Sequence, residues 1–211
     1  MKNLIKILSF NTFIPFFYPA LMLPLRSFRK KAINLLNFKA GDAVLVPGVG
    51  SGHDLSMIPD YVSVTGIDIS DVMLGIGKVK MKVMGHEKHI KLLKMDAEDL
   101  KFDDGTFDRA ILSLFLTVVF DPKQAFAEVV RVLKPGGQIL VFDHLLRKGT
   151  IPCTISKPID AVLSYSFASV TRTIDSIIEG QPVSIEEILP GDSVGFMKAF
   201  LLVKDKQPDQ V

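Results

Sequence analysis

Short apolar runs alternate with amphipathic stretches along most of the chain, and this alternation predicts a layered α/β fold. The runs VLV and ILVF lack polar alternation, which is expected of parallel strands that helices cover on both faces. Strands are expected at residues 43–47, 63–68, 90–95, 109–113 and 138–143. Helices are expected at residues 26–36, 71–84 and 122–133.

Two further apolar runs near the C-terminal end, residues 183–189 and 196–203, predict another pair of strands. They are joined by the short segment PGDSVG, which permits a hairpin but not a helical crossover. We therefore expect the last strand to run antiparallel to its neighbour in an otherwise parallel sheet. The sequence KPGG at residues 134–137 predicts a helix stop followed by a turn.

Charge is distributed unevenly along the 211 residues. Residues 1–40 hold seven of the 25 basic residues and none of the 23 acidic residues, so the rest of the chain is slightly acidic. This balance disfavours a nucleic-acid partner, which needs basic residues over much of the surface. Six lysines between residues 78 and 94 could contact phosphate, but their spacing is more typical of a solvated face.

The single cysteine, Cys153, excludes an intrachain disulfide framework and a multi-cysteine zinc site. No metal site is predicted. A protein with so little cysteine is expected in a reducing compartment, and we therefore expect a cytoplasmic location.

Residues 4–25 are mostly apolar and are followed by the basic run RSFRKK. Three prolines break any helix that would cross a membrane, and no small-residue cleavage site follows. Two interpretations remain open for residues 1–40. They form a lid over a single domain at 41–211, or residues 1–31 form a peripheral segment whose aromatic side chains enter the headgroup region while its cations contact anionic lipid.

Residues 44–54 read VLVPGVGSGHD, a strand followed by glycines at alternate positions. Gly48, Gly50 and Gly52 let the backbone approach a ligand closely, although such a turn alone also fits a sharp strand-to-helix connection. Asp68 ends the second strand, 20 residues after Gly48, where a carboxylate can accept hydrogen bonds from ribose hydroxyls. An aspartate there also fits a helix N-cap, but the two features together predict a nucleoside cofactor.

From residue 40 to 146 the chain resembles the class I S-adenosylmethionine-dependent methyltransferases. Four of their motifs occur in the family's order: VLVPGVGSG, GIDIS, MDAEDLKFDDGTFD and EVVRVLKPGGQILVFD. The resemblance implies a Rossmann-like, doubly wound, seven-stranded sheet, mostly parallel with an antiparallel last strand, and S-adenosyl-L-methionine as the cofactor. It also implies that Asp96 meets the adenine amino group beside Ala97, and that Ser113 lies near the methionyl part. The full set of cofactor-binding residues it implies is Gly48, Val49, Gly50, Gly52, Asp68, Ile69, Met73, Asp96, Ala97 and Ser113.

One position departs from the family pattern. Val46 stands where the family usually has an acidic residue at the end of the first strand. The family often uses that acid to organise the glycine turn or to meet the methionyl amine. His53 and Asp54, just beyond the glycines, are candidates to replace it. The departure also leaves open a non-catalytic module that keeps the fold without turnover.

Methyl transfer from a sulfonium is an in-line displacement that depends mainly on alignment, and it needs a base only when the acceptor carries a proton. His144 is the candidate catalytic residue because it directly follows the strand at 138–143, at the edge where open α/β sheets bind ligands. It could accept a proton from an amine or a thiol near neutral pH. A histidine that only hydrogen-bonds the chain is the alternative.

Within the family, the chain is most similar to the type 11 group that contains quinone C-methyltransferases, phospholipid N-methyltransferases and membrane-associated thiol S-methyltransferases. This similarity implies a small, lipophilic acceptor: a phospholipid amine, a quinone or a thiol. A nicotinamide-dependent oxidoreductase is a less favoured alternative, because the chain has no Tyr-x-x-x-Lys pair and its later motifs follow the methyltransferase pattern.

Overall fold

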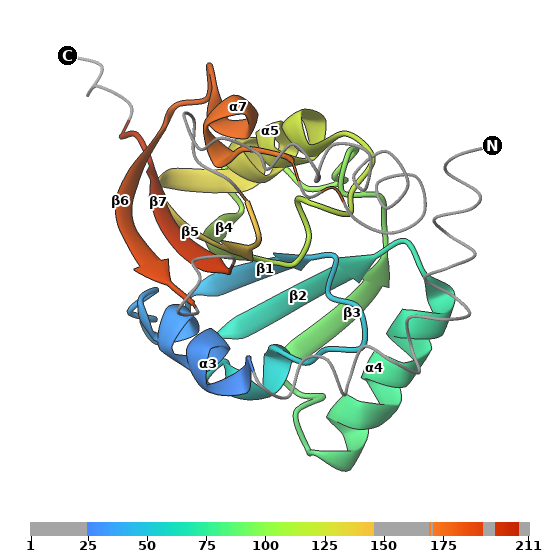
Figure 1. Ribbon diagram of the computed structural model, residues 1–211. Coiled ribbons are helices and arrows are strands. Elements are labelled where there is room, and N and C mark those ends of the chain that lie inside the picture. Colours follow the sequence, from blue (N-terminus) through green and yellow to red (C-terminus); the bar gives the residue numbers. More distant parts are fainter. Residues whose placement is uncertain (1–24, 146–168, 170, 192–196, 207–211) are drawn as a thin grey trace.

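The structure is a computed structural model that describes residues 25–145, 169, 171–191 and 197–206. Within these ranges the chain forms one seven-stranded sheet in the order β3-β2-β1-β4-β5-β7-β6 (Figure 1). The strands are β1 Ala43–Pro47, β2 Ser63–Asp68, β3 Ile90–Lys94, β4 Phe107–Ser113, β5 Leu133–Asp143, β6 Val183–Pro190 and β7 Lys198–Lys204. The helices are α3 Arg26–Asn34, the 3-10 turn η1 Leu55–Met57, α4 Asp71–Val83, α5 Pro122–Val132 and α7 Ile174–Ile178.

Strands β1 to β5 pair in parallel, and β7 runs antiparallel to both β5 and β6. The predicted α/β fold, doubly wound with an antiparallel last strand, is therefore confirmed. The strand order reverses between β1 and β4, which lie side by side although β2 and β3 intervene in sequence. In open sheets of this kind, ligands bind at the carboxyl ends of the strands where the order reverses.

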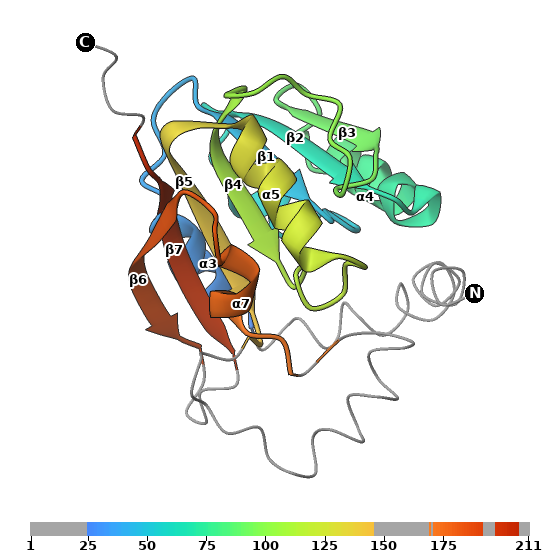
Figure 2. The same ribbon diagram turned by 90° about the horizontal axis from the view of Figure 1, so that it is seen from above.

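Helices cover both faces of the sheet. On one face, α3, η1 and α4 pack against the strands through a cluster that includes Ile33, Leu55 and Met81. On the other face, α5 and α7 pack through a cluster that includes Phe126 and Ile174 (Figure 2). The runs VLV in β1 and ILVF in β5 are buried, as predicted from the absence of polar alternation, whereas the edge strand β6 is mostly exposed.

Residues 134–137 lie at the start of β5, which the sequence did not predict. The helix α5 ends at Val132, one residue before the predicted end. The register shifts here, since Phe107 pairs with Leu133 whereas Arg109 pairs with Gln138, so β5 has three more residues than β4 over this span. Gly136 has a φ of 74° and follows Pro135, which fits the predicted tight turn within the strand.

The structure describes only part of the N-terminal region for which predictions were made. Residues 1–24 lie outside the described residues, so the two interpretations of residues 1–40 remain predictions, and Cys153 also lies outside. The helix α3 begins at Arg26, close to the predicted start. No helix within the described ranges is both long and apolar enough to cross a membrane.

Candidate functional site

The glycine turn after β1 adopts a conformation that requires glycine. Gly48, Gly50 and Gly52 have φ values of 63°, 54° and 72°. A Cβ on Gly48 would lie 2.4 Å from Cδ2 of Phe115, and a Cβ on Gly50 would lie 3.2 Å from Cε of Met73. Neighbouring side chains therefore fill the Cβ positions of the turn, while Gly48 and Gly50 stay half-buried, which suits backbone that a ligand approaches closely.

Asp68 joins the glycine turn to the first turn of α4. Its Oδ2 accepts a hydrogen bond from the Gly50 amide at 2.8 Å, and its Oδ1 accepts one from the Ser70 amide at 2.9 Å. Burial raises the pKa of the Asp68 carboxyl, while these amides act in the opposite direction. Each carboxylate oxygen can accept a second hydrogen bond, so the geometry fits a ribose with two hydroxyls.

The predicted N-cap role belongs to Ser70, whose side chain accepts the Met73 amide. Of the other predicted residues near this turn, Val49 and Met73 are buried and Ile69 is exposed. The Val49 amide donates to the Ile67 carbonyl at 2.9 Å, which fixes the turn against β2.

The segment after β3 forms the next wall of the site. The Met95 amide donates to the Asp68 carbonyl at 3.1 Å, so this segment starts beside the end of β2. Asp96 is exposed, and its Oδ1 accepts the Glu98 amide at 2.9 Å. Ala97 is buried. The structure thus brings the predicted adenine-side and ribose-side residues to the same edge of the sheet.

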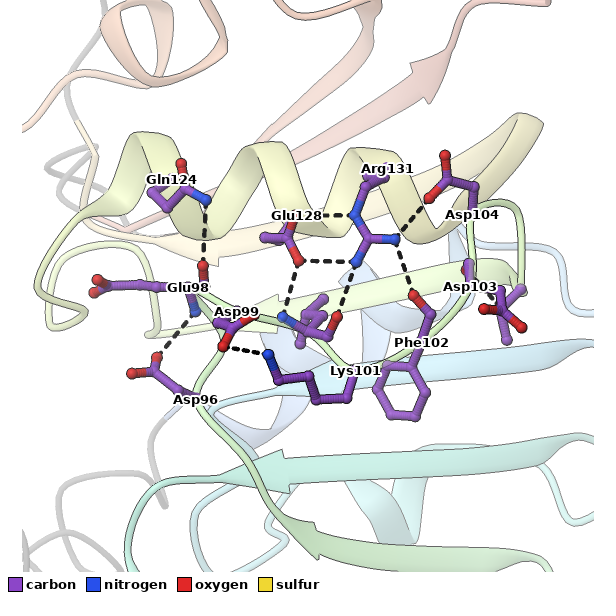
Figure 3. A network of polar contacts seen from close by, with 12 residues as sticks. Asp96, Glu98, Asp99, Lys101, Phe102, Asp103, Asp104, Gln124, Glu128 and Arg131 are labelled. Atoms are coloured by element: carbon purple, nitrogen blue, oxygen red, sulfur yellow. Dashed lines mark hydrogen bonds and ion pairs between the residues drawn. The ribbon is translucent and has the colours of Figure 1, made fainter.

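A polar network that sequence reasoning missed holds this segment on α5 (Figure 3). Arg131 donates to the carbonyls of Leu100 and Phe102, each at 2.9 Å, and also pairs with Glu128 and Asp104. Glu128 accepts the Leu100 amide at 2.9 Å. The hydrogen bond from Arg131 lowers the pKa of the Glu128 carboxyl. The i, i+3 spacing of Glu128 and Arg131 was the only local signal of this network.

A buried ion pair lies next to Ser113, the residue predicted to lie near the methionyl part of the cofactor. Arg29 of α3 contacts both carboxylate oxygens of Asp54, with Nε 2.7 Å from Oδ1 and Nη2 2.6 Å from Oδ2. The two side chains are only 4% and 9% exposed. Nη2 also donates to Oγ of Ser113 at 3.2 Å, and the guanidinium lies 5.8 Å from the ring centroid of Phe142. The space between these side chains does not admit a water molecule.

This pair bears on the missing acid of the family pattern. Val46 is buried in the core and contributes no polar group. His53 contacts Oγ of Ser51 through Nδ1 at 2.9 Å, and burial, with the charges of Lys80 and Arg29, lowers its pKa to about 4. His53 is therefore neutral near pH 7. Of the two candidates to replace the acid, Asp54 is the one that joins a charged arrangement next to Ser113.

His144 lies at the end of β5 beside a fully buried carboxylate. Its Nδ1 is 3.1 Å from Oδ1 of Asp143, and its Nε2 is 3.1 Å from the carbonyl oxygen of Ser169. Asp143 also accepts hydrogen bonds from the hydroxyl and the amide of Thr117. Both ring nitrogens thus face acceptor atoms. To act as a base toward an acceptor molecule, His144 must exchange its Ser169 contact for that molecule.

The residue after β4 is strained. Leu114 has a φ of 50°, which is rare for a residue with a branched side chain, and its amide donates to the Phe142 carbonyl at 2.7 Å. Such strain costs about 1–3 kcal/mol and gathers at functional sites. It turns the chain sharply between Ser113 and Phe115, the ring that packs under Gly48. The sequence offered no signal for this conformation.

Comparison with known proteins identifies the family. Residues 45–141 match the family described as "Methyltransferase domain". This segment is a methyltransferase domain. The recognition made from the four motifs is therefore confirmed, and the nicotinamide-dependent alternative loses its support.

The methyltransferase domain has named relatives. The chain is 38% identical over 107 residues to a phosphatidylethanolamine N-methyltransferase of Cereibacter sphaeroides, covering 51% of this chain and 53% of that protein. It is 34% identical over 122 residues to a ubiquinone/menaquinone biosynthesis C-methyltransferase of Geobacter sp. strain M21, covering 56% and 52%. The chain thus spans about half the length of these curated relatives.

Solved structures share the fold of the methyltransferase domain. A methyltransferase of Haloferax volcanii in complex with its activator Trm112 superposes with a TM-score of 0.75 at 17% identity, covering 93% of this chain and 98% of that chain. A SAM-dependent methyltransferase of Methanosarcina mazei gives a TM-score of 0.67 at 21% identity, covering 83% and 97%.

Within the described ranges, no group of three His, Cys, Asp or Glu side chains is arranged to hold a metal ion.

Proposed function

We propose that this protein transfers a methyl group from S-adenosyl-L-methionine to a small lipophilic acceptor. The observation that carries the proposal is the joint placement of the glycine turn and Asp68 at the carboxyl edge of a methyltransferase domain, where the strand order reverses. S-adenosylmethionine supplies a methyl group on a positively charged sulfur, which leaves as a neutral thioether.

The chain offers a partner for each part of the cofactor. The backbone of Gly48 to Gly52 lies against its middle, the carboxylate of Asp68 accepts its ribose hydroxyls, and Asp96 with Ala97 meets the adenine. Ser113, with the Arg29–Asp54 pair behind it, faces the methionyl part. These roles rest on the resemblance together with the fact that the residues gather at one edge.

Alignment of the two reactants supplies most of the rate enhancement in such a displacement. Phe115 is buried under the glycine turn and leaves no space for water there. His144, held by the buried Asp143, orients the acceptor or takes its proton once its Nε2 leaves the Ser169 carbonyl. A thiolate, which carries no proton, would depend on this step less than an ammonium group that must first lose one.

Among lipophilic acceptors we favour a phospholipid amine. The relative with 38% identity is named for phosphatidylethanolamine, whereas the quinone relative given above is 34% identical. The apolar and basic sequence of residues 1–31 also suits an acceptor that resides in a membrane. We accordingly propose a cytoplasmic protein in peripheral contact with lipid.

A methyl-transfer assay tests this function. The purified protein is incubated with methyl-labelled S-adenosylmethionine and, in separate reactions, with phosphatidylethanolamine vesicles, a quinol precursor and a small thiol. We expect label in the phosphatidylethanolamine fraction. Label in the quinol or the thiol alone would show that the acceptor is that molecule and not a phospholipid amine. Binding of the cofactor with no transfer to any of them would favour the non-catalytic module.

A further inference from the structure

The outward side of α4 is apolar where a surface helix is normally polar. Among the described residues, six of the eight large apolar side chains that are exposed lie between residues 69 and 84. Four of them follow one another along α4 at spacings of four, three and four, which places them in one row on the helix. This row, here called the α4 stripe, consists of Val72, Ile76, Val79 and Val83, which are 44%, 41%, 65% and 81% exposed.

The α4 stripe is not the side of the helix that packs in the core. The opposite side of the same helix carries Met73, Leu74 and Met81, which are buried against the sheet. The helix thus has two apolar sides, of which the sheet covers one. Contiguous exposed apolar groups of this kind mark a surface that contacts another body.

Exposed cations lie beside the stripe. They are Lys78 and Lys82 on α4, whereas Lys80 is half-buried and donates to the Gly52 carbonyl. The helix α3 covers the same face of the sheet (Figure 1) and adds further exposed cations without any acid. The only acidic residue in the two helices is Asp71, which is paired with Lys94. The cations on α3 that are exposed are Arg26, Lys30 and Lys31.

We propose that the outer face of α3 and α4 docks on an anionic lipid surface. The stripe enters the boundary between headgroups and acyl chains, and the surrounding cations lie at the level of the lipid phosphates. A second copy of the chain would bring the same cations against each other. Residues 1–24 carry two lysines and no acid, so they offer these cations no counter-charge either. An anionic lipid surface satisfies both the apolar row and the charges.

The position of the stripe would bring the lipid surface close to the candidate cofactor site. The helix α4 begins just after Asp68, so the stripe starts at the carboxyl edge of the sheet and runs away from it. A lipid surface along α4 therefore lies next to the candidate cofactor site. The docking itself requires neither cofactor nor turnover, so it stands or falls separately from the proposed function.

Vesicle flotation of the full chain, without cofactor, tests the proposal. Vesicles of phosphatidylglycerol and phosphatidylcholine are compared with vesicles of phosphatidylcholine alone at low and high salt. The test variants are V79S/V83S, which removes the most exposed apolar groups, and K78E/K82E, which reverses two charges. Ile188→Ser and Lys101→Glu are matched controls, because these residues are exposed on other elements. Circular dichroism verifies that all variants are folded.

We expect binding to the anionic vesicles that weakens with salt and persists in both controls. Each lysine near an anionic surface is worth about five-fold in affinity, so K78E/K82E should weaken binding by at least about 25-fold. V79S/V83S should weaken it by about ten-fold or more. No flotation of the wild-type chain, or flotation of both test variants that equals that of the wild-type chain, overturns the proposal. A wild-type dimer that V79S/V83S dissociates in light scattering also overturns it, because a second copy would then cover the stripe.

Discussion

Replacing Arg29 by methionine removes the cation from the buried pair between α3 and the turn after the glycine loop. In the native structure the guanidinium contacts both oxygens of Asp54 and donates to Ser113. Methionine has a similar length and fills the space under Phe142 without a charge. The variant leaves the Asp54 carboxylate buried and without its guanidinium partner.

The size of the effect follows from burial. Removing one partner of a buried ion pair costs about 3–5 kcal/mol, because the remaining charge keeps its desolvation penalty. This is a large share of the about 5–15 kcal/mol that stabilises a domain. Adding Asp54→Asn to the same chain removes the stranded charge, so we expect the double variant to recover about 2 kcal/mol or more. Arg29→Lys keeps a charge but loses the planar fork of the guanidinium. Its stability should therefore lie between that of the native chain and that of Arg29→Met.

Urea unfolding followed by circular dichroism measures these stabilities, since the chain has no tryptophan for fluorescence. Calorimetry then compares binding of S-adenosylhomocysteine with binding of 5′-methylthioadenosine, which lacks the amino and carboxyl groups. If the pair supports the methionyl site, the folded double variant loses affinity for the first ligand and keeps it for the second. Native stability in the Arg29→Met variant would refute the buried pair, and equal losses for both ligands would refute its methionyl role.

Three further outcomes are expected. His144→Ala should lower turnover by about 10²-fold or more while cofactor affinity stays close to native, and unchanged turnover would leave His144 a structural residue. Arg131→Lys should cost about 1–3 kcal/mol in urea unfolding and weaken S-adenosylhomocysteine binding, because the three N–H groups of an ammonium cannot replace the five hydrogen bonds of the guanidinium; a change under about 0.5 kcal/mol would contradict this. His53 has a pKa lowered to about 4, so the folded state resists a proton that the unfolded chain takes up below its ordinary pKa of 6.5. Between pH 6.5 and 4, the free energy of unfolding of the wild-type chain should therefore fall by about 1–2 kcal/mol more than that of His53→Gln, after allowance for solvent screening. Parallel pH profiles of the two chains would exclude His53 as the cause.

The glycine turn and Asp68 could be predicted from the sequence because their signals are local. Alternate glycines require positive φ at a turn, and a carboxylate at the end of the next parallel strand lies beside the first strand by the geometry of the sheet. The central strands were predicted for a similar reason, since the apolar runs of β1 and β5 are buried and lack polar alternation. These arguments need only the spacing along the chain.

The parts that escaped prediction depend on tertiary contacts. Arg29 reaches Asp54 from a helix 25 residues away, and nothing in its own segment distinguishes it from the neighbouring cations. Arg131 serves carbonyls about 30 residues earlier in the chain. At KPGG, a Cβ on Gly137 would lie 2.8 Å from the Lys134 carbonyl and 3.0 Å from the Asp108 carbonyl, so the pattern predicted a turn but not its close packing against β4 at the start of β5.

Calorimetric binding of S-adenosylhomocysteine to the wild-type chain and to Asp68→Ala tests the central claim most directly. The wild-type chain should bind, and Asp68→Ala should lose about 1–3 kcal/mol, because hydrogen bonds from two ribose hydroxyls to a carboxylate are removed. Asp71→Ala is the matched control, since its carboxylate is exposed on the next element and should leave affinity unchanged. No binding to the wild-type chain, or native affinity in a folded Asp68→Ala variant, would contradict a cofactor site at the glycine turn.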